Sequence, residues 1–250
     1  WYTDDSHKTL IRGGVGIFTG RVPFVWLSNA YNNTGMESMG TTIEPKQGNN
    51  HTNTAPSLAQ YAKDPMGAAT SVETGALRPD IVTVDKDFKY PQVLRANLAL
   101  EQRLPGDVKL TLEGIYSKTM NNVFFENLAL NNDGEKVYAI PGVEASAAPF
   151  YSKTRSNYYS IVNLRNTNKG YTYAFSASLA KSFDFGLDMS ASYTFGRSKS
   201  VNDGTSSVAY SNWKYNYSRD TNSENELGFS KFDVPHRLMA QLSYTTPKYL

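Results

Sequence analysis

Residues 170–196 constrain the fold most, because they contain two arms in which apolar and polar side chains alternate, joined by a short turn. Alternation with a period of two is typical of a β-strand whose two faces differ. The apolar faces of the two arms agree if the loop has three residues, 184–186, so that Phe183 lies opposite Leu187. Such loops need a left-handed residue at the position of Gly186. The segment is therefore predicted to form an antiparallel hairpin.

The hairpin arms have one apolar, aromatic face and one face of small or polar side chains. The apolar face carries Tyr171, Tyr173, Phe175, Ala177 and Leu179 in the first arm and Leu187, Met189, Ala191, Tyr193 and Phe195 in the second. Each arm has about 11 to 13 residues, whereas ordinary strands have about 5 to 6. A tilted strand needs about 9 to 11 residues to cross a bilayer, so the arms are long enough to span one.

The composition suits a membrane barrel better than a water-soluble core. The chain is 40% apolar with a mean hydropathy of -0.48, and its 17 Tyr outnumber its 12 Phe, as expected where rings lie at a membrane interface. No apolar run reaches the roughly 18 residues of a membrane helix, so only a closed barrel could cross. The absence of cysteine excludes disulfides and thiolate sites, and a net charge of +2 argues against a nucleic-acid partner.

Four further arms show the same alternation, at residues 9–20, 91–104, 108–118 and 237–245. With the hairpin arms, taken as 171–183 and 187–197, they give six long predicted strands in one domain over residues 1–250. Three-residue turns at 105–107 and 184–186 alternate with long polar segments at 21–88, 119–169 and 198–236, which include strand-like pieces at 123–130 and 158–164. This alternation of short and long connections is typical of outer-membrane barrels, whose external loops are long. The predicted fold is an all-β, antiparallel transmembrane β-barrel segment.

The face opposite the apolar one is predicted to line the lumen of the barrel. Its candidate residues are Arg95, Asn97, Glu101, Arg103, Lys109, Glu113, Ser178, Asp188, Arg237 and Gln241. Glu101 and Glu113 could in principle form an acid–base pair. Because they share their face with Arg103 and Lys109, a salt network is the favoured interpretation.

Aromatic side chains among Asn, Ser and Arg in the polar segments are candidates for substrate binding, because such compositions suit binding surfaces. They are Trp26, Tyr31, Tyr151, Tyr159, Tyr210, Trp213 and Tyr215, with Tyr158 and Tyr217 nearby. The alternative is that these rings pack the loops together. No catalytic residues, metal site or cofactor are predicted: His7, His51 and His236 lie in separate segments, and His236 is expected to start a strand.

Four stretches carry a family resemblance: RGGVGIFTGRVPFVWLSN, PQVLRANLALEQRLPGDVKLTLEGIYSKTMNNVFFENL, the hairpin, and FDVPHRLMAQLSYTTP. They resemble the barrel of TonB-dependent outer-membrane receptors, especially those with a carboxypeptidase-regulatory-like N-terminal domain. The resemblance implies a location in the cell outer membrane and a barrel of about 22 strands around an N-terminal plug. It also implies uptake of a bulky nutrient, with outer-membrane lipid, TonB, the plug and a nutrient ligand or surface lipoprotein as partners.

The chain departs from this family because it has no plug and no TonB-contacting box, and its six arms are fewer than the about eight of the smallest closed barrels. A barrel fragment with two unpaired edges is therefore expected, one that is neither an enzyme nor a transporter on its own. The alternative is a soluble all-β sandwich whose loops bind a glycan or a protein.

Overall fold

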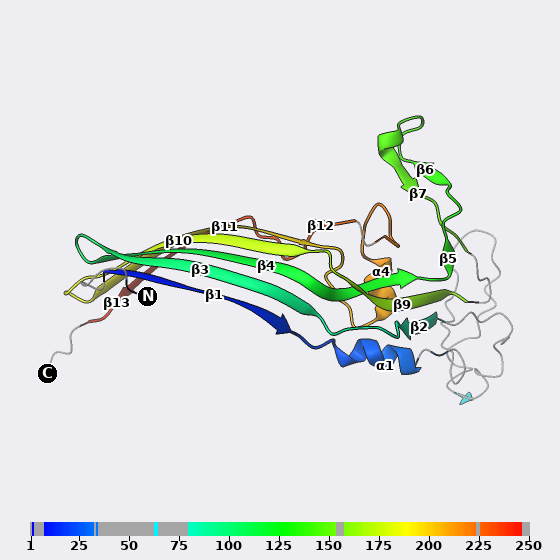
Figure 1. Cartoon of the computed structure of the whole chain (residues 1–250), viewed down its shortest axis with the longest axis horizontal. Helices are drawn as coiled ribbons and strands as arrows, with labels where there is room; N and C mark the ends of the chain where they lie inside the picture. Colours follow the sequence, from blue (N-terminus) through cyan, green and yellow to red (C-terminus); the bar gives the residue numbers. More distant parts are fainter. Residues whose placement is uncertain are drawn as a thin grey trace.

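The computed structural model describes residues 8–32, 80–153, 158–223 and 226–246, together with Tyr2, Thr34, Lys63 and Asp64. Two of the histidines considered above, His7 and His51, lie outside the described residues. Figure 1 shows a long, curved sheet with its short turns at one end and a group of smaller elements at the other.

Six long strands form the sheet, as the alternation predicts. They are β1 (Thr9–Thr19), β3 (Gln92–Leu104), β4 (Val108–Asn127), β10 (Tyr171–Ser182), β11 (Leu187–Ser200) and β13 (His236–Tyr244). They pair antiparallel in the order β1-β3-β4-β10-β11, with β13 beyond β11, and the two-residue strand β12 (Gly228–Phe229) pairs with the far end of β11. The all-β, antiparallel prediction is confirmed. Within the described residues the sheet is open, with β1 and β13 at its edges.

Both short turns have the predicted length and geometry. The backbone N–H of Phe183 donates to Leu187 at 2.8 Å, and Gly186 has a φ of 90°. In the other turn Leu104 pairs with Val108, and the intervening Gly106 and Asp107 have φ of 77° and 57°. Because register has a period of two, these turns place the apolar faces of the joined strands on one side of the sheet.

The long polar segments contain more structure than the alternation predicts. Strand β4 continues nine residues past its predicted end at 118, to Asn127, where it pairs with β9 (Ser160–Thr167). β2 (Asp80–Val84) pairs parallel with β9, and two helices, α1 (Phe24–Asn32) and α4 (Ala209–Lys214), pack beside them. We call this group the lobe. The prediction of irregular loops at 21–88 and 198–236 is wrong for these helices.

The lobe, and not the sheet, holds the hydrophobic core. Its buried residues come from every lobe element: Val22, Trp26, Val82, Val123, Phe125, Val162, Leu164 and Ala209. The helix α1 fits this core because Trp26 and Ala30 are four residues apart, which places them on one helical face, and Val22, two residues before the helix begins, is buried in the same core. Two core positions are too few to stand out in the sequence as a helical period.

A small hairpin projects from the lobe (Figure 1). It consists of β6 (Lys136–Tyr138) and β7 (Ala147–Pro149), with the 3-10 turn η2 (Glu144–Ser146) before β7. At its base β5 (Leu130–Asn131) pairs with β8 (Ser152–Lys153). In the described ranges, no helix is both long enough and apolar enough to span a membrane.

Candidate functional site

The long strands divide their side chains into an apolar face and a polar face. In β10 the apolar face carries the odd-numbered positions 171–181 and the polar face the even-numbered positions 172–182, and the strand registers extend both faces across the sheet. The apolar face is the more exposed: Phe175 is 60% and Leu179 47% accessible, whereas Ser176 and Ser178 are half-buried. A water-soluble fold would reverse this order, because apolar side chains are the first to be buried.

The polar face contains a charge network that extends from the middle of the long strands toward the turn end of the sheet. Glu101 accepts from Lys109 at 2.6 Å and from Arg12 at 3.0 Å, and Arg12 also lies 3.6 Å from Glu113. These four residues come from β1, β3 and β4. Arg12 therefore joins both carboxylates that the sequence suggests as a pair, and the salt-network interpretation describes their geometry.

Two other basic residues of the predicted lumen face, Arg103 of the predicted salt network and Arg95, have different partners. Arg103 is on the polar face but pairs with Asp107 in the turn, at 3.4 Å. Arg95 donates to the hydroxyl of Ser117 at 3.1 Å, nearer the lobe. Sequence reasoning missed Arg12, although its position on the polar side of the 9–20 arm was a usable signal.

All ten predicted lumen residues share the polar face. Ser178 lies opposite Thr111 and Ser192, Asp188 opposite Ser243, and Gln241 opposite Ser190. The remaining members follow from the same registers: Arg237 opposite Thr194, and Asn97 opposite Ile115. Side chains of this kind keep their hydrogen bonds when water covers them, so this face can line an aqueous space.

The predicted binding aromatics have two different environments. Trp26 is 6% exposed, and its ring lies edge-on to that of Phe125, with the ring centroids 5.1 Å apart. Its indole N–H donates to the carbonyl of Ser206 at 2.7 Å. Trp213 packs against the same core and donates to Asn222 at 2.9 Å. Both tryptophans hold loops together, which is the alternative stated above; Trp26 is buried and Trp213 is partly buried.

The tyrosines lie closer to solvent. Tyr31, at the end of α1, is 81% exposed, and Tyr159 and Tyr215 are also exposed. Tyr210 lies against Tyr159, with ring centroids 5.6 Å apart, and burial raises the pKa of its hydroxyl. Burial, together with the hydrogen bond to Asp220, raises the pKa of Tyr151 to about 12. The exposed three remain available for contact with a ligand.

Two carboxylates, which sequence reasoning missed, fix the chain where β11 enters the lobe. Asp203 accepts hydrogen bonds from Ser200 at 2.6 Å, Ser230 at 2.8 Å and the backbone of Lys231 at 2.7 Å. Burial by itself would raise the pKa of Asp203, but these hydrogen bonds outweigh it and lower the pKa below its usual value. The pattern of an Asp near Ser residues in a turn is a weak sequence signal, because most such residues are simply solvated.

The second carboxylate, Asp233, precedes β13. It accepts from the backbone of Ser198 at 2.5 Å and pairs with Arg197 at 3.1 Å. Two residues on, the carbonyl of Pro235 accepts from Gly196 at 3.0 Å. His236 is the first residue of β13, as expected, and its Nδ1 lies 2.7 Å from the hydroxyl of Tyr193.

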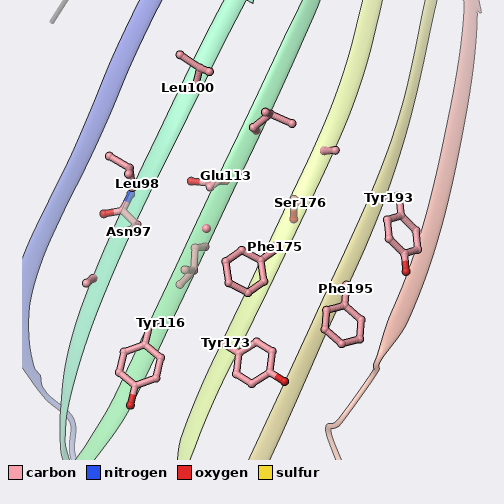
Figure 2. Close-up of a pocket in the computed structure, with 15 residues that line it drawn as sticks. Asn97, Leu98, Leu100, Glu113, Tyr116, Tyr173, Phe175, Ser176, Tyr193 and Phe195 are labelled. Carbon is pink, nitrogen blue, oxygen red and sulfur yellow. The ribbon is translucent and has the colours of Figure 1, made fainter.

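The apolar face has a broad hollow of about 1120 Å³ (Figure 2). It extends from β3 to β11 and is bordered by the rings of Tyr116, Tyr173, Phe175, Tyr193 and Phe195. In the part of the chain that the structure describes, no three His, Cys, Asp or Glu side chains gather as metal ligands would.

Comparison with known proteins gives one match. A family model described as "Outer membrane beta barrel domain" matches residues 1–249. No curated protein and no solved structure matches the chain.

Proposed function

Since the chain belongs to the outer membrane beta barrel domain family and its place is the cell outer membrane, we propose that it is part of the barrel wall of a TonB-dependent receptor that takes up a bulky nutrient. The observation that carries this proposal is the division of the six long strands into an outer apolar face and an inner polar face. The stretches that resemble TonB-dependent receptors supply the finer assignment, including the plug and TonB as partners.

The apolar face has the height of a bilayer. Tyr171 lies beside Lys118 and Lys199 at the lobe end, and Lys181 marks the turn end of the same face. The ten steps from Tyr171 to Lys181 cover about 33 Å along the strand at roughly 3.3 Å per residue. With a tilt of about 45°, the height is about 23 Å, close to the ≈ 25 Å apolar band of outer-membrane barrels.

Rings lie at both ends of this band, as in the aromatic girdles of such barrels. Tyr116, Tyr171 and Tyr173 lie toward the lobe, and Phe185 and Tyr244 lie at the turn end. Because external loops are the long ones, the lobe faces outward and the three-residue turns face the periplasm.

In this orientation, the polar face lines the lumen and the charge network extends from the middle of the lumen toward its periplasmic end. The exposed tyrosines of the lobe, Tyr31, Tyr159 and Tyr215, are then at the outer surface, where they contact the nutrient. The soluble-sandwich alternative needs a second layer over the apolar face, and the described residues place none there.

The proposal is tested on the full-length gene product in its own cells. The protein is extracted from the outer membrane with detergent and run on a gel with and without boiling, and a mobility shift on boiling is the expected sign of a folded barrel. Nutrient uptake is tested separately by comparing growth of strains lacking this gene or TonB on a panel of bulky nutrients as sole source. A growth defect that both strains share on one nutrient supports TonB-dependent uptake of that nutrient. The proposal is refuted if the strain lacking this gene grows normally on every nutrient on which the strain lacking TonB fails.

A further inference from the structure

Side chains on the apolar face change in a regular order with distance from the lobe. Cross-strand neighbours form rungs, and the rung nearest the lobe is Lys118–Tyr171–Lys199, with Phe229 beyond Lys199. The next rung is Tyr116–Tyr173–Arg197. Cations and tyrosine hydroxyls therefore occupy the part of the apolar face that lies at the outer edge of the bilayer.

The following two rungs enclose the hollow shown in Figure 2. They are Gly114–Phe175–Phe195 and Leu112–Ala177–Tyr193. Gly114 and Ala177 are the small residues of these rungs, and the Phe175 ring covers Gly114, where an added Cβ would lie 3.4 Å from the ring. It crosses four strands, which is about 14 Å at roughly 4.8 Å per spacing, and is broad enough for several acyl chains side by side.

The cations above the hollow are held in place with protons still available. Lys199 lies 4.9 Å and Arg197 5.2 Å from the centre of the Phe229 ring. Lys118 donates to two backbone carbonyls, at 3.0 and 3.3 Å, and an ammonium group has three protons to give. Asp233 pairs with Arg197, so it offsets one of the three positive charges and the balance remains positive.

We propose that the hollow and the two basic rungs above it form a binding site for a phosphate-bearing, multi-acyl lipid of the outer leaflet. The acyl chains lie against Phe175 and Leu112 in the hollow, and the phosphate meets Lys118 and Lys199 at headgroup depth. Lysine and arginine attract anionic headgroups at this depth, and charge-assisted hydrogen bonds to phosphate are among the stronger ones. This site depends on the apolar face contacting lipid, and it does not depend on nutrient uptake.

The turn end of the same face gives a matched comparison. Among the described residues it has one lysine, Lys181, whose ammonium lies 4.6 Å from the Phe183 ring centre. Ala191, on the apolar face of β11, pairs with Leu179 outside the hollow. Lys181→Gln removes the same charge as Lys199→Gln, and Ala191→Phe adds the same ring as Ala177→Phe, in both cases away from the proposed site.

The test is native mass spectrometry of the full-length gene product in mild detergent, after a boiling-dependent gel shift has established that each variant is folded. Phosphatidylglycerol and phosphatidylcholine with identical acyl chains are the probes. The wild type is expected to retain phosphatidylglycerol at lower lipid concentration. Lys199→Gln should weaken that binding about fivefold, since an interfacial lysine contributes roughly this factor. Ala177→Phe should weaken binding of both lipids.

The two control variants are expected to bind as the wild type does. Equal retention of the two lipids by the wild type would overturn the proposal. Equal effects of Lys199→Gln and Lys181→Gln on phosphatidylglycerol binding would also overturn it, because any lysine on the apolar face would then attract the lipid regardless of its position. A folded protein with no lipid preference would leave the nutrient-uptake proposal intact, so the two failures are distinguishable.

Discussion

Leu179 and Ser178 are adjacent in β10 and have opposite surroundings. Leu179 lies between Leu110 and Ala191 on the apolar face, and Ser178 lies between Thr111 and Ser192 on the polar face. In the proposed orientation, Leu179→Arg places a charge in lipid between mid-membrane, where it costs about 2 to 4 kcal/mol, and the turn end of the band, where the cost falls to about 0 to 1 kcal/mol. We expect Leu179→Arg to impair assembly of the full-length protein and Ser178→Arg to be tolerated, as measured by the folded fraction on a boiling-shift gel. Equal folding of both variants would contradict the assignment of the faces.

Asp203 gives a pH-dependent prediction outside the membrane-spanning strands. Its pKa is below the usual 3.8, so its hydrogen bonds stabilise the folded lobe above about that pH, and this contribution is lost as pH falls through the lower folded pKa. Proteolysis of residues 198–231 by an acid-active protease such as pepsin should therefore increase at the acid end of a pH series. The Asp203→Asn variant should be cleaved readily at every pH, so its cleavage rate should depend less on pH than that of the wild type. An unchanged profile in this variant would show that Asp203 is not the titrating group.

Residues on the long strands were predictable because their environment repeats every second position. A side chain in β3 or β10 lies on one face of the sheet or the other according to whether its residue number is odd or even. The ten predicted polar-face positions therefore follow from the strand registers. Arg12 was missed because the four glycines of its arm weaken the alternation there. Asp203 and Asp233 were missed because most of their partners are distant in the sequence: Ser230 and Lys231 for Asp203, and Arg197 and Ser198 for Asp233. The local signal, Ser200 three residues before Asp203, is weak.

At the scale of elements, the lobe was the part that sequence reasoning did not find. β2 and β9 pair in parallel although they lie on either side of the β3–β4 hairpin in the chain, and α1 and α4 meet over them only after those strands are placed. Trp26 illustrates the difficulty: a ring among Asn and Ser residues suits either a binding surface or a small core, and only its tertiary contacts decide. The strand-like pieces at 123–130 and 158–164 did indicate the extension of β4 and the position of β9.

The lobe and the sheet are predicted to respond separately to mutation. Trp26→Ala removes a buried ring, its contact with Phe125 and its hydrogen bond to Ser206, a change that typically costs about 3 to 5 kcal/mol. We expect faster proteolysis within the lobe, with the boiling-dependent shift of the barrel retained. Tyr31→Ala, on the same helix but 81% exposed, is the matched control and should behave as the wild type. Loss of the gel shift in Trp26→Ala would mean that the sheet depends on the lobe.

At the scale of the whole molecule, the position of the membrane follows from how far the separation of faces extends. The cationic rung Lys118–Tyr171–Lys199 and Lys181 bound the apolar band, and between them every odd-numbered position of β10 lies on the apolar face. The charge network extends from the middle of this band toward its turn end, and the lobe lies beyond the opposite end of the band. In the proposed orientation, one barrel wall thereby combines a lipid contact, a wet inner surface and an external cap.

This arrangement predicts a period of two in chemical accessibility across the membrane. The chain has no cysteine, so single cysteines can be introduced along β10 in the full-length protein reconstituted in vesicles, after replacement of any cysteines elsewhere in the gene product. A charged, water-soluble maleimide should label Ser176→Cys and Ser178→Cys through the lumen, and it should not label Ala177→Cys or Leu179→Cys, whose thiols lie in lipid and stay protonated there. A lipid-soluble maleimide and denaturation in detergent serve as controls that all four thiols are present and reactive. Uniform labelling of the four positions would mean that water reaches both faces, which is incompatible with a wall in the membrane. Labelling of the odd positions alone would place the apolar face inward and reverse the lumen, lipid-site and nutrient assignments together.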